Sequence, residues 1–80
     1  MKNKKILLLV HQGKKVKIIG FERRGAYFQR RLLEMGLLPG KIIEVVRNTN
    51  TGPVEINVMG SNLAIGRGIA SKILVEEIDE

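Results

Sequence analysis

The absence of cysteine limits how this eighty-residue chain can be held together. No disulfide can cross-link it, and one histidine without cysteine rules out a tetrahedral zinc site within a single chain. A chain of this length buries only about 60–65% of its unfolded surface. The core must therefore come from aliphatic packing, which a hydrophobic content of 44% with 4% aromatic residues allows. The sequence predicts a single domain over residues 1–80.

Alternation of apolar and polar residues, together with runs of β-branched residues, predicts a mainly β domain. Strands are expected at residues 14–21, 42–47, 54–58 and 71–78. Residues 6–10 form either a strand or a short docking segment, and residues 63–65, after a turn at 60–62, are too short for more than an edge piece. Residues 66–70 predict a helical turn. About five short strands in so short a chain predict a small, partly open barrel, because closure hides strand edges.

One short α-helix is expected at about residues 25–35. Phe28, Leu32 and Met35 are spaced four and three residues apart, so they share one helical face. Gly36 stands where a glycine commonly ends a helix, and Leu37 follows it for the accompanying apolar contact. The pair Pro39-Gly40 then predicts a tight turn that reverses the chain.

The segment LLEMGLLPG at residues 32–40 resembles the signature of the FeoA family, small cytoplasmic partners of bacterial ferrous-iron transport. The order that follows is also similar, with an aliphatic strand, a polar loop and the triplet Leu63-Ala64-Ile65. The likeness covers residues 14–77, and residues 1–12 match least. Many relatives carry a basic residue directly after that triplet, where this chain has Gly66 and then Arg67.

The resemblance implies an SH3-like barrel and a cytoplasmic location. It also implies an accessory or regulatory role in ferrous-iron uptake through binding to FeoB, the membrane GTPase permease. The chain would then be peripheral to the membrane only through that partner. The same barrel forms the C-terminal domain of iron-dependent repressors, so the fold alone does not decide the role.

Basic charge is concentrated in the first half of the chain. Residues 1–40 contain ten Lys and Arg against two acids, whereas residues 41–80 contain four against six, and the total is +6. The candidate partner-binding cluster consists of Arg23, Arg24, Arg30 and Arg31. Guanidinium groups bind carboxylates in pairs of hydrogen bonds, so this cluster suits an acidic protein surface. The alternative is a solvated helix face on which Arg30 pairs with Glu34.

Leu38 is a second candidate for partner contact. An exposed leucine directly before the Pro39-Gly40 turn could insert into a partner. Against this stands the general tendency of leucine to be buried, which favours a place in the core. The sequence leaves the two roles open.

Catalytic and cofactor signatures are missing from the sequence. His11 has no adjacent nucleophile or orienting partner, so we expect no enzyme. Residues 66–71 match a dinucleotide-binding glycine motif only weakly, and no cofactor is predicted. Iron prefers imidazole and carboxylate ligands, and His11 with the C-terminal carboxylates offers at most a weak site for ferrous iron or another divalent metal.

Three other functions compete with an interaction module. Nucleic-acid binding suits the positive charge, but single strands need exposed aromatic residues for stacking, which makes nucleic acid an unlikely partner. A groove for proline-rich peptides is aromatic-lined, and this chain has no tryptophan. An iron-linked sensor domain would lack DNA-binding helices of its own. The edge near residues 63–65 leaves self-association open.

Overall fold

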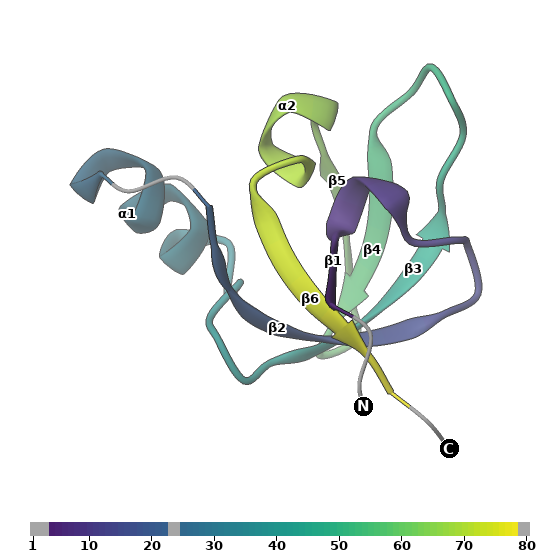
Figure 1. Cartoon of the computed structure of the whole chain (residues 1–80), viewed down its shortest axis with the longest axis horizontal. Helices are drawn as coiled ribbons and strands as arrows, with labels where there is room; N and C mark the ends of the chain where they lie inside the picture. The colour runs from purple at the N-terminus through teal and green to yellow at the C-terminus, as the bar shows by residue number, and fades with distance from the viewer. Residues whose placement is uncertain (1–3, 23–24, 79–80) are drawn as a thin grey trace.

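The computed structural model describes residues 4–22 and 25–78, which form one curved antiparallel sheet with two helices (Figure 1). The strands are β1 (Lys4–Ile6), β2 (Lys15–Phe21), β3 (Ile42–Arg47), β4 (Val54–Val58), β5 (Ser61–Ile65) and β6 (Ile73–Glu77). Their order across the sheet is β1-β6-β2-β3-β4-β5. The expected small, partly open barrel is confirmed, with six strands in the described residues where about five were expected.

The first segment combines the two structures that the sequence left open. β1 ends at Ile6, and Leu7–Leu9 form a 3₁₀ turn, η1. A continuous strand would place Leu7 and Val10 on opposite faces, whereas the turn buries both. The Asn48 side-chain amide donates to the carbonyl oxygens of Leu8 (2.9 Å) and Val10 (2.7 Å), which ties this segment to the end of β3.

The core is aliphatic throughout, as the composition requires. In β4 every second residue is buried (Val54, Ile56 and Val58), and β2 buries Val16 and Ile18 in the same way. Among the described residues, none of the buried core side chains is aromatic. Phe21 and Phe28 instead meet edge to face beside the core, with ring centroids 6.2 Å apart. Aliphatic burial at two-residue spacing therefore determines which face of each strand points inward.

The helix α1 (Ala26–Glu34) begins and ends where the sequence predicts. The Leu37 N–H donates to the Leu32 carbonyl (2.8 Å) and the Gly36 N–H to the Leu33 carbonyl (2.9 Å). Gly36 has φ +80, a conformation open to glycine at little strain. These two bonds form a Schellman cap, and Leu32 and Leu37, the apolar pair that accompanies it, are both buried.

Two turns after α1 set the register of the sheet. The Gly40 N–H donates to the Ile18 carbonyl (2.7 Å) and the Ile18 N–H to the Lys41 carbonyl (2.9 Å), so the predicted Pro39-Gly40 turn is fastened to β2. The hairpin between β4 and β5 turns at Met59 and Gly60, earlier than the expected 60–62, because both residues adopt positive φ (+51 and +87). Ser61 consequently joins β5, which is longer than the expected edge piece.

The edge strand β1 is held to β6 by an ion pair. The Lys5 ammonium donates to the Glu77 carboxylate at 2.7 Å and joins β1 to β6. This hydrogen bond is the main reason that the pKa of Glu77 lies below its ordinary value. A lowered pKa in the folded state stabilises the fold above the unfolded pKa, and that contribution disappears as the pH falls through the folded value.

Candidate docking groove between the two helices

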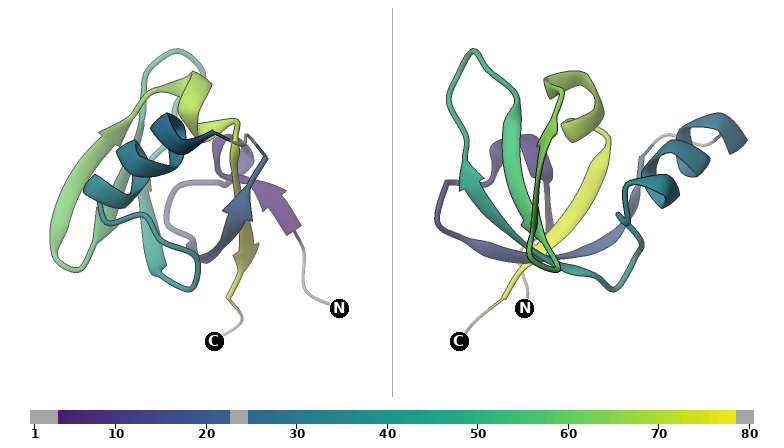
Figure 2. Two further views of the ribbon diagram at one scale, coloured as in Figure 1. Left: turned by 90° about the vertical axis from the view of Figure 1, so that its left-hand side faces the viewer. Right: turned by 180° about the vertical axis from the view of Figure 1, so that it is seen from behind.

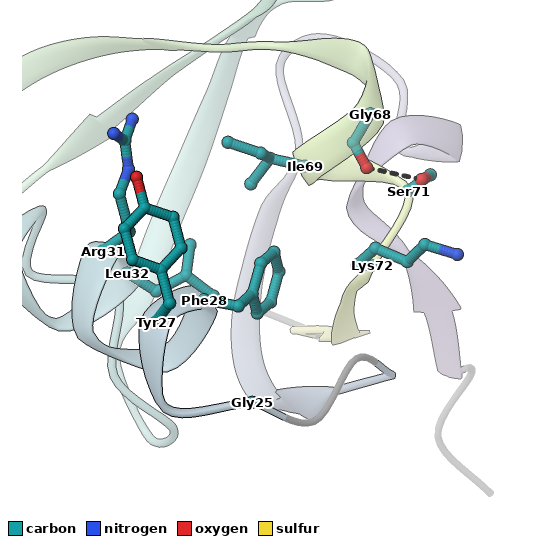
Figure 3. Close-up of a pocket in the computed structure, with 9 residues that line it drawn as sticks. All are labelled: Gly25, Tyr27, Phe28, Arg31, Leu32, Gly68, Ile69, Ser71 and Lys72. Atoms are coloured by element: carbon teal, nitrogen blue, oxygen red, sulfur yellow. Dashed lines mark hydrogen bonds between the residues drawn. The ribbon is translucent and has the colours of Figure 1, made fainter.

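A pocket of about 610 Å³ lies between α1 and the segment formed by α2 (Arg67–Ala70) and the two residues that lead into β6 (Figure 3). Its lining residues are Gly25, Tyr27, Phe28, Arg31, Leu32, Gly68, Ile69, Ser71 and Lys72. Helix α1 projects from the side of the barrel, as Figures 1 and 2 show. We call this site the helix groove.

The floor of the helix groove is apolar. Phe28 from α1 and Ile69 from α2 point into the space between the helices, with Leu32 beside Phe28 (Figure 3). Both Phe28 and Ile69 are partly buried against the core. Tyr27 lies at the rim and is 75% exposed. An apolar floor with an exposed aromatic residue at its rim is typical of protein-docking sites, where tyrosine is enriched.

The charged groups of the helix groove are all cationic. Arg31 and Lys72 line it from opposite sides, the Lys72 ammonium extends outward from the rim (Figure 3), and no acidic residue is among the described lining residues. Both side chains belong to exposed residues, and neither forms an ion pair within the described part of the chain. Two unpaired cations on either side of an apolar floor complement an acidic segment that carries an apolar side chain.

The predicted basic cluster is divided by the structure. Arg23 and Arg24 lie outside the described residues. Arg31 lines the helix groove. Arg30 is exposed but does not line it, because consecutive residues are about 100° apart around a helix. Of the two arginines of the cluster that the structure describes, Arg31 lines the groove and Arg30 does not.

Leu38 lies at a different place from the groove. It is 39% exposed, which excludes the core position among the two roles that the sequence leaves open, whereas Leu37 is buried. The chain buries Leu37 as part of the helix cap and then turns at Pro39, which leaves Leu38 on the outside. Ile42 and Met59 are also exposed, and the Lys41 Nζ lies 3.3 Å from the Met59 sulfur. Leu38 remains a candidate for partner contact, separate from the helix groove.

Ile69 and Lys72 were not anticipated as site residues. Their segment was predicted as a helical turn leading into a strand, but no local pattern shows that it faces α1. The contact between residues some forty positions apart arises only when β6 pairs with β2. Tyr27 carried a readable signal, since it is an aromatic residue beside the predicted apolar stripe of the helix.

The chemistry of the groove is that of binding. Of its two hydroxyl residues, Tyr27 and Ser71, Ser71 donates from Oγ to the Gly68 carbonyl at 2.7 Å, and no histidine or carboxylate is among the described lining residues. His11 is exposed. Across the described residues no group of three or more His, Asp or Glu side chains comes together in a metal-binding arrangement. Within the same residues, neither helix has the length and apolar character to cross a bilayer.

Arg67 holds the β3–β4 loop. Its guanidinium donates from Nη1 to the carbonyl oxygens of Thr49 (2.7 Å) and Gly52 (3.3 Å).

Replacing Arg67 with alanine should therefore loosen this loop and lower the free energy of unfolding by about 1–2 kcal/mol. Hydrogen exchange of the amides in residues 48–52 measures the loosening. Arg47→Ala, on an exposed residue at the end of β3, is the matched control. Equal protection in the two variants would contradict the anchoring role.

Comparison of the sequence with known proteins identifies a family for this chain. The sequence model of the FeoA domain matches residues 6–77. The chain is 49% identical over 55 residues to "Putative Fe(2+) transport protein A" of Methanocaldococcus jannaschii, covering 69% of this chain and 66% of that protein. It is 40% identical over 70 residues to "Fe(2+) transport protein A/Fe(2+) transporter FeoB fusion protein" of Porphyromonas gingivalis, covering 86% of this chain and 8% of that protein.

Solved structures share the fold. The crystal structure of an "Iron Uptake Regulatory Protein (FeoA)" superposes with a TM-score of 0.89 at 30% identity, covering 95% of this chain and all of the other. The helices and the open barrel described above are therefore similar in a solved protein of that name.

Proposed function

The chain belongs to the FeoA domain family, and from this we propose that it is a cytoplasmic, non-enzymatic accessory protein of ferrous-iron uptake that binds a FeoB-like permease through the helix groove. One observation carries the proposed site. The groove has an apolar floor between two unpaired cations on opposite sides. The proposed occupant is an acidic segment of the permease with an apolar anchor.

The fused relative supports the choice of partner. In that protein, a segment similar to this chain is joined to a transporter named FeoB. Covalent fusion gives two modules a high effective concentration, which favours even a weak contact between them. A separate chain must reach the same contact by its own affinity, so complementary charge and an apolar anchor become important.

A binding partner of this size acts by shifting an equilibrium. The permease would change conformation only if this chain binds its acidic segment more tightly in one of two permease conformations than in the other. A ligand shifts the equilibrium between two conformations only by the difference in its affinity for them. The nucleic-acid alternative is less favoured, since Tyr27 is the one exposed aromatic residue of the described part of the chain. We retain the accessory role as the proposed function.

The proposal predicts where the permease touches this chain. In a titration of the ¹⁵N-labelled protein with the GTPase domain of its cognate permease, and then with the full permease in nanodiscs, saturable amide shifts should gather at residues 25–32 and 68–72. Arg31→Glu and Lys72→Glu should each weaken binding about tenfold or more, because they place a like charge against an acidic segment.

Arg30→Glu is the matched control, since it makes the same charge change on the same helix outside the groove lining. It should weaken binding less than about threefold, through screened long-range attraction alone. Equal losses for Arg30→Glu and Arg31→Glu would overturn the groove as the site. Absence of shifts with both forms of the permease would overturn the partner.

A further inference from the structure

The two edges of the sheet are protected to different degrees. β1, at one edge, contains Lys4 and Lys5, and lysines on an edge strand discourage pairing with another chain. β5, at the other edge, has the sequence SNLAI and is the one strand among the six described that carries no charged residue. β5 also contains no proline. In a chain with 28% charged residues, the open edge is thus left without the usual deterrents.

The hairpin geometry determines which backbone groups of β5 are free. Met59 and Gly60 form a two-residue turn with both φ angles positive, and Val58 pairs with Ser61 across it. Since hydrogen-bonded pairs alternate along an antiparallel ladder, Ser61, Leu63 and Ile65 face β4 with their N–H and C=O groups. The N–H and C=O groups of Asn62 and Ala64 point to the open side, and both residues are exposed.

The open edge is self-complementary. Residues 60–66 read GSNLAIG, with Leu63 at the centre and a glycine at each end. If a second copy pairs antiparallel about Leu63, Asn62 faces Ala64 of the second copy in two hydrogen-bonded pairs, giving four backbone bonds. Gly60 then faces Gly66 of the second copy, and the space beside each of these glycines is open. No charge meets a charge within this window.

We propose that the β5 edge is a docking site for the β5 edge of a second copy of this chain, joining two open barrels into one continuous sheet. This inference does not rest on the proposed function, because β5 contributes no residue to the helix groove. The contact is small and therefore weak. The net charge of +6 on each copy opposes it, but the charges lie outside the window and are screened by salt.

The test is the oligomeric state of the full chain. Sedimentation equilibrium and NMR diffusion from about 10 µM to about 1 mM cover the range expected for a weak contact. Apparent mass should rise towards the dimer, and the amide signals of Asn62 and Ala64 should shift with concentration. Raising the salt from about 50 to about 500 mM should strengthen the dimer, since it screens repulsion between like charges. A monomer at all concentrations and both salts would overturn the proposal.

Two edge variants separate strand pairing from other contacts. Ala64→Pro removes an outward N–H and keeps the ladder to β4, and should abolish the dimer. Asn62→Lys places two like charges near each other and should weaken it about tenfold at low salt. Thr51→Lys adds the same charge on an exposed loop residue and should dimerise like the wild type, apart from a small salt-sensitive loss. Dimerisation of the folded edge variants at wild-type strength would place the contact elsewhere.

Discussion

Replacing Ile43 with alanine should lower the free energy of unfolding by about 2–5 kcal/mol, because a buried isoleucine loses its packing and leaves a cavity. Ile43 is 1% exposed and faces the core from β3. A domain of eighty residues has a total stability of about 4–12 kcal/mol. The substitution therefore removes a large share of the stability, and no disulfide compensates for it.

The neighbouring Ile42 is the matched control. It is the same residue type on the same strand, but it is 55% exposed on the outer face. Ile42→Ala should lower the free energy of unfolding by less than about 1 kcal/mol. Urea denaturation of both variants, with the slope of the transition checked for constancy, measures the difference. Similar losses at the two positions would mean that the register of β3 is wrong by one residue.

The second large effect is expected at Asn48. Replacing it with aspartate keeps the size of the side chain but removes the amide that donates to Leu8 and Val10. A carboxylate would then face two carbonyl oxygens. Because each orphaned, partly buried acceptor costs about 1–3 kcal/mol, the substitution should lower the free energy of unfolding by about 2–4 kcal/mol and release η1 from the end of the barrel.

The effect of this substitution should depend on pH with a definite sign. Acidification towards about pH 4 protonates a carboxyl group, and the protonated form regains one O–H donor. The stability gap between Asn48→Asp and the wild type should therefore shrink as the pH falls. Asn50→Asp, on an exposed loop residue, controls for the added charge. A stability difference that stays constant or widens on acidification would contradict a stabilising role for the hydrogen bonds from Asn48 to Leu8 and Val10.

Local signals in the sequence account for most of the secondary structure. Gly36 and Leu37 predict the helix cap because a left-handed residue and an apolar contact are both needed within two positions. Val54, Ile56 and Val58 predict a strand because alternate burial is a property of the extended chain itself. Predictions were less accurate where two local solutions compete. Residues 6–9 are divided between β1 and η1, and Met59 has a positive φ that moves the expected turn one residue earlier.

The helix groove was only partly predictable for a different reason. Tyr27, Phe28 and Arg31 lie within about one turn of one another on one helix, so their proximity follows from helical spacing. Ile69 and Lys72 come from another part of the chain. The predicted cluster of arginines rested on nearness in sequence alone, and the helix separates Arg30 from Arg31 by orientation.

The sequence by itself determined the family, the mainly β class, the position of α1 and the aliphatic character of the core. These properties depend on periodicity, turn residues and a contiguous signature, which are all local. The tertiary structure alone decided which cations share a groove, that Leu38 is exposed beside a buried Leu37, and that the uncharged strand β5 lies at an open edge. Those properties depend on pairing between segments distant in the chain. The residue pattern of a single strand does not show which strands lie next to it in the sheet.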